Sequence, residues 1–458
     1  MDDNELEEIL EDMEMGDEPW FNSENGQKRN IETIARFLGK EKQALVPLSF
    51  PRYYRELLAW ALAHYIENKG WEITDVLGHR GRMPRYADVN TDYDRYENLL
   101  CDGYLLLQKE DSRIVVSIKT SSRQPPSLVI VSHGQKEGVD FAEGVQKFVT
   151  GNNPYKGKKL KFTGHIRFLE LPPKSWQDIT LAPALKDEIE TNTVGFLNRT
   201  VELAKYGISP RRGIILVGEP GTGKTLICKI LMSQSSGITC ILAEGSCLTS
   251  SLYISDLYEL AQDLSPSMVF IEDIDLIAEE RRESHYTRAE ALATLLSALD
   301  GIEECEEVVT VATTNFIETI DKALAERPSR FDRIIRLTAP LLEHRKELIK
   351  ALSGRIHMDE AAQDYLARRT DGYTPAQIQE AAYSLVIEQK HDLLCSELGC
   401  CRFGINEVNN ILCKTNSKKE MGFSKVGNNG DKSGEYAIYD SMAGSQADKL
   451  EKGGNTDE

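Results

Sequence analysis

The chain has 458 residues, enough for two or three domains, and 41% of them are hydrophobic, so a sizeable core can be buried. The net charge of −19 argues against nucleic acid as the default partner. The acidic N-terminus does not have the pattern of a signal peptide. The longest apolar run, near Leu57–Ala63, is far shorter than the roughly 20 residues that span a bilayer. We therefore expect a cytoplasmic protein with no membrane segment and with free cysteine thiols.

Residues 1–30 are predicted to form a disordered acidic arm. Residues 1–18 contain ten acidic side chains and no basic one, so about half of the excess negative charge is concentrated there. A solvated extension is the ordinary interpretation of such a run, and a docking tail for a basic partner is the alternative.

Residues 31–170 are predicted to form a separate α/β domain. Apolar residues recur at helical spacing from Arg52 to Asn68, and Gly70 follows as a stop signal. The charged segment Lys109–Arg113 separates two apolar runs, which indicates a hairpin. Leu171–Pro173 is the expected hinge to the next domain. The predicted strands of this first domain are Gly103–Gln108, Ile114–Ile118, Ser127–Ser132 and Lys161–Glu170.

Strands and helices alternate over residues 171–340, as in a parallel sheet covered by helices. Residues 341–413 are predicted to form a helical lid, in which Thr374 suits a helix N-cap. Residues 414–458 are rich in Gly, Ser, Asn and Lys, and we expect a flexible tail. The predicted lid helices are Leu342–Leu352, Asp359–Arg368 and Pro375–Gln389.

Four cysteines gather late in the chain, with His391 nearby. Their spacing matches no established zinc pattern, so packed thiols are favoured over a metal site. The four residues are Cys395, Cys400, Cys401 and Cys413.

A phosphate-binding loop stands at Gly218–Thr225. The apolar run Ile214–Val217 before it is typical of a buried parallel strand, and a helical run follows it. In this context the pattern G-x-x-x-x-G-K-T aims backbone N–H groups and the positive end of a helix dipole at phosphate. We expect Lys224 to reach the β- and γ-phosphates and the Thr225 hydroxyl to ligate magnesium. The expected nucleotide-binding residues are Gly218, Glu219, Pro220, Gly221, Thr222, Gly223, Lys224, Thr225 and Leu226.

Two carboxylates, Glu272 and Asp273, follow the apolar run Met268–Ile271. Ligands of open α/β sheets bind at the carboxyl ends of the strands, so both side chains are expected at the nucleotide rather than in an ordinary acidic helix cap. A third strand, Val308–Asn315, ends in polar groups. Asn315 is either a turn residue or the group that orients the attacking water.

Two arginines, Arg327 and Arg330, bracket a proline shortly after the third strand. An isolated pair of arginines is usually a solvated surface feature. Because the two arginines follow the third strand, a role for them in contact with a nucleotide is the alternative.

Together these parts resemble the AAA family of ATPases over about residues 175–410. The resemblance implies a P-loop sheet of five parallel strands flanked by helices, followed by a helical lid. It also implies a homo-oligomeric ring, usually a hexamer, that hydrolyses ATP with Mg²⁺ and moves a macromolecular client. The segments that carry it are Trp176–Ile179, Lys205–Ile208, the Walker A sequence GEPGTGKT, the Walker B sequence FIEDID, Leu295–Gly301, the sensor sequence ATTN and the arginine segment RPSRFDR.

The resemblance also implies roles outside the phosphate loop. Arg327 and Arg330 would be arginine fingers that act in trans on the adjacent subunit, where such a finger can be worth about 10³–10⁵ in rate. The N-terminal domain would choose a protein client. Its loop Gly78–Arg85 carries three arginines, for which a solvated loop is favoured over an anion-binding site.

The sequence departs from the family pattern at two places. Many members carry an aromatic–aliphatic–glycine pore loop, whereas Gly245–Tyr253 is shorter and lacks that triplet, and Tyr253 is expected to belong to the next helix. The segment Thr180–Ala182 lacks a glycine pair. This second departure and the Glu-Asp order of Walker B are similar to the subgroup that includes the mitochondrial complex III assembly chaperone, for the ATPase module only.

The expected function is therefore Mg-ATP hydrolysis by a ring that remodels a protein or protein complex. A nucleotide-dependent scaffold or switch with slow hydrolysis is the alternative, which the shortened pore loop favours, and a nucleic-acid-linked ATPase comes third. By position, Glu272 takes the magnesium side through a water and Asp273 is the base, and the expected metal-site residues are Thr225, Glu272 and Asp273. Asp is about 1.5 Å shorter than Glu. A misplacement of about 1 Å can cost on the order of 10² in rate, so slow turnover is expected.

Overall fold

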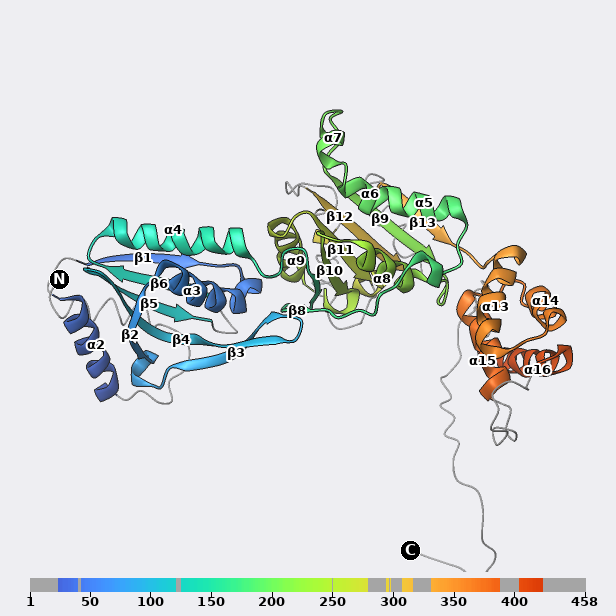
Figure 1. Ribbon diagram of the computed structural model, residues 1–458, viewed down its shortest axis with the longest axis horizontal. Coiled ribbons are helices and arrows are strands. Elements are labelled where there is room, and N and C mark those ends of the chain that lie inside the picture. The colour runs from blue at the N-terminus through green and yellow to red at the C-terminus, as the bar shows by residue number, and fades with distance from the viewer. Residues whose placement is uncertain are drawn as a thin grey trace, which may run out of the picture.

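The computed structural model describes residues 24–39, 43–120, 125–248, 250–278, 294, 295, 297, 307–315, 331–387 and 403–422. Three bodies follow one another along the chain: an antiparallel sheet with helices, a mainly parallel sheet with helices, and a helical bundle (Figure 1). The parallel sheet lies between the other two. Among the residues described, no helix combines the length and the apolar character needed to cross a membrane.

The N-terminal sheet has strands in the order β1-β6-β5-β4-β2, and β3 also pairs with β4. Side chains alternate between its two faces. Tyr104 and Leu106 of β4 pack with helix α2 (Glu24–Leu38), whereas Leu105 and Leu107 pack with α3 (Arg55–Lys69) and α4 (Gln135–Asn152) on the other face. The strands are β1 (Ala44–Ser49), β2 (Glu72–Leu77), β3 (Arg85–Asp92), β4 (Arg95–Lys109), β5 (Ser112–Lys119) and β6 (Ser127–Ser132).

Three local predictions for this region are confirmed. The predicted helix from Arg52 is a short 3-10 turn followed by α3, and Gly70 ends it at a left-handed φ of 70°. The predicted hairpin is the antiparallel pair β4–β5, in which Lys109 pairs with Ser112. The predicted strand Ser127–Ser132 is β6.

The second sheet has the order β13-β9-β12-β11-β10-β7-β8, and all of its strand pairs are parallel except β7–β8. Ile214 and Leu216 of β9 face a cluster with α5 (Pro183–Asn192), α6 (Val194–Leu197) and α8 (Lys224–Gln234). Ile215 and Val217 face the cluster that contains α9 (Ser251–Asp263). The strands are β7 (Lys159–Phe162), β8 (Ile166–Phe168), β9 (Arg211–Gly218), β10 (Thr239–Glu244), β11 (Ser267–Glu272), β12 (Val308–Thr314) and β13 (Arg333–Leu337).

One predicted strand belongs to a different sheet from the one expected. Residues 161–170 were expected in the N-terminal domain, but β7 pairs with β10 and β8 pairs with β7, so this segment extends the parallel sheet from five strands to seven. Leu160 and Phe162 are 0% and 1% exposed there. Their alternation predicts a strand but does not say which neighbour it pairs with.

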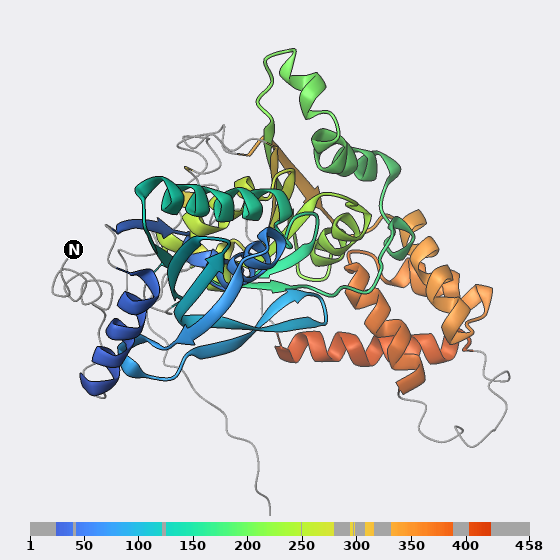
Figure 2. The same ribbon diagram turned by 60° about the vertical axis from the view of Figure 1, so that its left-hand side comes forward.

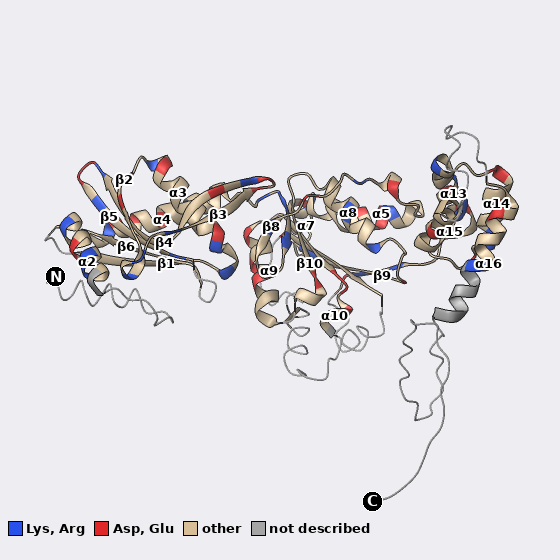
Figure 3. Cartoon of the chain, turned by 90° about the horizontal axis from the view of Figure 1, so that it is seen from below, with Lys and Arg blue, Asp and Glu red and all other residues tan. Residues whose placement is uncertain are grey.

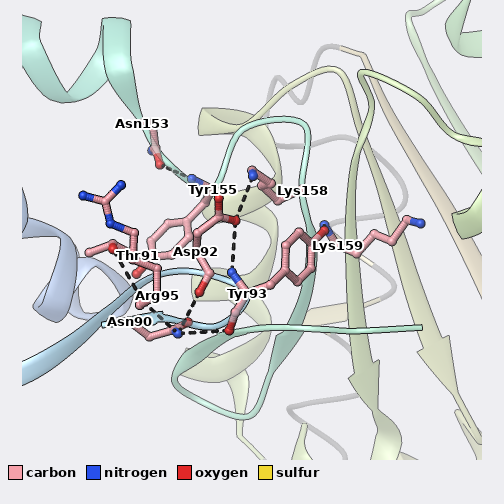
Figure 4. Close-up of polar contacts among 9 residues, drawn as sticks. All are labelled: Asn90, Thr91, Asp92, Tyr93, Arg95, Asn153, Tyr155, Lys158 and Lys159. Carbon is pink, nitrogen blue, oxygen red and sulfur yellow. Dashed lines mark hydrogen bonds and ion pairs between the residues drawn. The ribbon is translucent and has the colours of Figure 1, made fainter. Parts of the chain in front are cut away.

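The two sheets meet where the β3–β4 hairpin reaches the chain leading into β7 (Figure 4). Lys158 Nζ lies 2.8 Å from Asp92 Oδ1, and the Lys159 N–H donates to Tyr93 Oη over 3.2 Å. The rings of Tyr93 and Tyr155 both pack against Phe168 of β8, with centroid distances of 5.5 and 5.4 Å. Polar and aromatic contacts therefore tie the hairpin tip to the edge of the parallel sheet.

The helical bundle contains the three predicted lid helices and a fourth, α16, which continues into the predicted tail. The apolar spacing ends near Leu412, and the sequence beyond it is polar, so hydropathy alone gave too early an end. Residues 1–23 of the predicted arm, Cys395, Cys400, Cys401 and the last part of the predicted tail lie outside the described residues. The prediction of disorder is wrong for residues 24–30, which form the first half of α2, because apolar side chains further along this helix pack on the N-terminal sheet. The helices are α13 (Leu342–Ile356), α14 (Glu360–Arg369), α15 (Pro375–Ile387) and α16 (Ile405–Gly422).

Helices α5 and α6 continue into α7 (Thr200–Ala204), which stands out from the parallel sheet as a green projection (Figure 2). Val201 on α7 and Tyr206 just after it are 74% and 76% exposed. The family-like segment Lys205–Ile208 therefore lies on an exposed part of the chain rather than in the core.

If β7 is an integral strand of the parallel sheet, Leu160→Ala should cost about 2–5 kcal/mol of unfolding free energy, because it removes a fully buried side chain. Chemical unfolding of the whole chain followed by tryptophan fluorescence measures this. Leu341→Ala is the matched control, since Leu341 is 71% exposed, and its cost should stay within about 0.5 kcal/mol. Equal effects of the two substitutions would contradict the strand's placement.

Candidate active site

The phosphate loop joins the carboxyl end of β9 to the first turn of α8. Gly221 and Gly223 have φ values of 85° and 103°, a left-handed region that glycine adopts without steric cost. A Cβ placed at Gly218 would lie 2.5 Å from the Leu337 carbonyl oxygen on β13. The glycines therefore allow both the curl of the loop and its close contact with the neighbouring strand.

The helical bundle touches this loop through the start of α15. The Ala376 N–H donates to the Gly221 carbonyl over 3.2 Å, and a Cβ at Gly221 would lie 2.7 Å from Ala376 Cβ. Thr374 and Gln377 form a reciprocal cap at this helix start, with Thr374 N–H donating to Gln377 Oε1 over 3.0 Å and Gln377 N–H to Thr374 Oγ1 over 3.4 Å. The start of α15 thus lies directly on the phosphate loop.

Lys224 is buried at the start of α8, with 7% of its surface exposed. Its Nζ donates to the carbonyl oxygens of Gly218 and Glu219 over 2.7 and 3.1 Å, and to Asn315 Oδ1 over 2.8 Å. Burial lowers the pKa of the ammonium, and Asp273 and then Asp275 oppose that shift. The three acceptor oxygens therefore hold the Lys224 side chain in place beside the loop.

Asn315 links this lysine to Asp273. The Asn315 amide Nδ2 donates to Asp273 Oδ1 over 3.4 Å, while its Oδ1 accepts from Lys224. The Asp273 N–H donates to Thr313 Oγ1 over 3.1 Å, and Asp273 has a φ of 51°. Burial raises the pKa of the Asp273 carboxyl, the Asp275 charge adds to that rise, and Lys224 opposes it.

Glu272 ends β11 and lies opposite Glu244 at the end of β10. It is half-buried, and the hydrogen bonds described above reach Asp273 rather than Glu272. The two adjacent carboxylates therefore have different surroundings, with Asp273 on the side of Lys224 and Asn315.

The structure adds positioning residues that the sequence did not identify. Asp275, at the start of α10 (Asp275–Ala278), accepts at Oδ1 from Thr314 Oγ1 over 2.7 Å and from the Asn315 N–H over 3.4 Å. Thr313 holds the backbone of Asp273. A third carboxylate in FIEDID and two threonines before Asn315 were visible signals, but only pairing of β11 with β12 shows that they meet.

The remaining predicted site residues fall into two groups. Thr225 and Glu219 are exposed at the loop, and Leu226 is partly buried in the first turn of α8. Arg327 and Arg330 lie outside the described residues, as does most of Leu295–Gly301. The structure therefore brings the phosphate loop, Asp273 and Asn315 together and does not describe the arginines.

The shortened pore-loop region folds as expected around Tyr253. This residue belongs to α9 and is 41% exposed, while Leu257 and Leu260 on the same helix are buried. A Cβ placed at Gly164, in the turn between β7 and β8, would lie 2.9 Å from the Tyr253 ring. Tyr253 thus packs beside the added strands of the sheet.

The donor set suits a nucleotide and its magnesium ion together. Among the described residues, no group of three or more His, Cys, Asp or Glu is arranged to hold a metal ion. Magnesium bound by nucleotide hydrolases takes few protein ligands and completes its shell with phosphate oxygens and waters. Thr225, Glu272 and the concave glycine loop fit that pattern, because they offer a hydroxyl, a carboxylate and N–H groups for phosphate.

Strand β9 of the parallel sheet leads into a G-x-x-x-x-G-K-T loop and helix, and Glu272 and Asp273 lie at the carboxyl end of β11, which is separated from β9 by β12 alone; this is the arrangement of a P-loop nucleotide-binding fold. Residues 214–339 match the family described as "ATPase family associated with various cellular activities (AAA)". The chain therefore contains an AAA ATPase domain.

The chain is also similar in sequence to several curated proteins. The chain is 34% identical over 234 residues to "ATPase family gene 2 protein" of Saccharomyces cerevisiae, which covers 48% of this chain and 30% of that protein. It is 33% identical over 221 residues to "Cell division cycle protein 48 homolog" of Archaeoglobus fulgidus, covering 46% and 30%. It is 28% identical over 294 residues to "Cell division control protein 48 homolog B" of Arabidopsis thaliana, covering 61% and 45%. The matches thus span about a third to a half of these relatives.

Gly221→Ala should weaken ATP binding at least about tenfold, because the new methyl group meets Ala376 and the left-handed φ is strained. Titration with a fluorescent ATP analogue measures the Kd. Gly237→Ala is the matched control, since Gly237 has a similar φ of 77° but nothing within 4 Å of its Cβ position. Unchanged affinity in Gly221→Ala would show that the contact between loop and bundle is not needed for binding.

Proposed function

We propose that this chain binds Mg-ATP at the phosphate loop and hydrolyses it to remodel a protein or protein complex. The observation that carries the proposal is the hydrogen-bonded series from Lys224 through Asn315 to Asp273. It aligns a phosphate-binding cation, a polar group for the attacking water and a carboxylate base at one edge of the sheet. The match to the AAA family supports the same reaction.

Each residue has a stated role in this proposal. The loop Gly218–Leu226 would hold the phosphates, Lys224 would neutralise charge on them, and Thr225 and Glu272 would hold the magnesium ion, Glu272 through a water. Asp273 accepts the proton of the attacking water, which Asn315 orients. A magnesium ion held there would supply neutralisation of the negative charge on the phosphates.

We further propose a homo-oligomeric ring, a hexamer by analogy with the family, in which Arg327 and Arg330 act on the neighbouring subunit. The N-terminal sheet would bind the protein client. The Glu-Asp order at Glu272 and Asp273 supports the proposed likeness to the subgroup of the complex III assembly chaperone.

A nucleotide-dependent scaffold or switch is the second candidate, favoured by one observation. Tyr253 lies on α9 and packs beside Gly164, so the described chain offers no aromatic–aliphatic–glycine loop there for gripping a threaded peptide. Nucleic acid is a weaker candidate. Figure 3 shows acidic and basic residues interspersed along the described chain, rather than a basic stripe.

Asp273→Asn should leave the Kd for ATP within about threefold and lower turnover at least about 10²-fold, because it removes the proposed base but keeps its shape. Steady-state phosphate release and nucleotide titration measure the two quantities. Glu272→Gln is the comparison variant. If Glu272→Gln alone abolishes turnover while Asp273→Asn retains it, the two roles are reversed.

The ring predicts that specific ATPase activity rises with chain concentration, since each site needs arginines from a neighbour. Arg330→Ala should lower turnover by about 10³-fold or more without loss of ATP binding. Arg333→Ala, at the exposed start of β13, is the matched control and should have little effect. Tight ATP binding with negligible turnover at every concentration would favour the scaffold or switch.

A further inference from the structure

Strand β7 carries a lysine to the carboxylates at the end of the parallel sheet. Lys161 Nζ lies 2.6 Å from Glu244 Oε1. Glu244 is the last residue of β10 and is in register with Glu272 on β11. Lys161 is in register with Leu242, two residues before Glu244, so Lys161, Glu244 and Glu272 share one face of the sheet.

The backbone beside Glu244 packs directly against the proposed base. A Cβ placed at Gly245 would lie 2.3 Å from the Asp273 carbonyl oxygen and 3.3 Å from that of Glu272. Asp273 has a left-handed φ, which a non-glycine residue keeps only when its surroundings hold it there. A shift of Glu244 would therefore be transmitted through Gly245 to the backbone that carries Asp273.

Two negatively charged side chains lie opposite each other at this edge of the sheet, and a nearby cation reduces their repulsion. Like charges directly opposite on neighbouring strands destabilise the pair, and Glu244 lies opposite Glu272. Lys161 neutralises Glu244, and the hydrogen bond to Glu244 raises the pKa of the ammonium, with a smaller contribution from Glu272. The side chains of Lys161 and Glu244 are 39% and 43% exposed, so this ion pair contributes little to overall stability.

We propose that Lys161 is a positioning residue for ATP hydrolysis, which acts through Glu244 to hold the end of β10 against the backbone of Asp273. This inference rests on the proposed ATPase function. It adds a residue outside the family-matched segment 214–339. Lys161 also follows Lys158, which the N-terminal hairpin holds through Asp92, so the N-terminal sheet is connected to the catalytic edge by a few residues of strand.

The test is steady-state ATPase activity of the full chain at varied ATP. Lys161→Met should lower kcat about tenfold and leave KM within about twofold, because the phosphate loop is untouched while the base is displaced. Lys161→Arg should keep kcat within about twofold of the unmodified chain. Lys159→Met is the matched control, since Lys159 lies one repeat earlier on the same face of β7 and its removal should leave both constants unchanged.

A double-mutant cycle with Glu244→Gln separates positioning from a general loss of charge. Lys161→Met should change kcat by less than about twofold in the Glu244→Gln background, because the partner through which it acts is already neutral. An undiminished tenfold loss in that background, an unchanged kcat in Lys161→Met, or a change confined to KM would overturn the proposal. No turnover in the unmodified chain would overturn the proposed function as well, whereas normal turnover in both chains would overturn only the role of Lys161.

Discussion

Lys224, Asn315 and Asp273 follow three neighbouring strands, and hydrogen bonds join them in one series. The parallel pairing of β9 with β12 and of β12 with β11 brings the three strand ends to one edge of the sheet. A shift of one residue in either pairing would turn the side chains to the opposite face and break the series. The register of these strands is therefore the constraint on which the site depends, and Thr313, Thr314 and Asp275 reinforce it with their own hydrogen bonds.

The added strands β7 and β8 connect the N-terminal sheet to the parallel sheet. One continuous hydrophobic cluster includes Leu107 of the N-terminal sheet, Leu160 of β7 and Ile271 of β11. The hairpin tip at Asp92 and Tyr93 contacts the chain entering β7, and β7 contacts β10. A molecule that binds the N-terminal sheet would thus act on β7, which is a strand of the parallel sheet that carries the candidate site.

Local patterns predicted much of the fold and the central part of the site. The phosphate loop could be predicted because its glycines and its lysine all lie within the short segment Gly218–Thr225. The lid helices could be predicted from the spacing of their apolar residues and from the N-cap residue Thr374. The partner of β7 was not predictable, because alternation of Leu160 and Phe162 suits either sheet. Contacts such as Asp275 with Thr314 and Lys161 with Glu244 join residues far apart in sequence, and only strand pairing brings them together.

We propose that Asp273, rather than Glu272, faces the water that attacks the γ-phosphate. A structure of the chain with magnesium and a non-hydrolysable ATP analogue tests it directly. We expect a water in line with the γ-phosphate within hydrogen-bond distance of the Asp273 carboxylate and Asn315, with Glu272 on the magnesium side. A water held by Glu272, with Asp273 turned away from the phosphate, would contradict it.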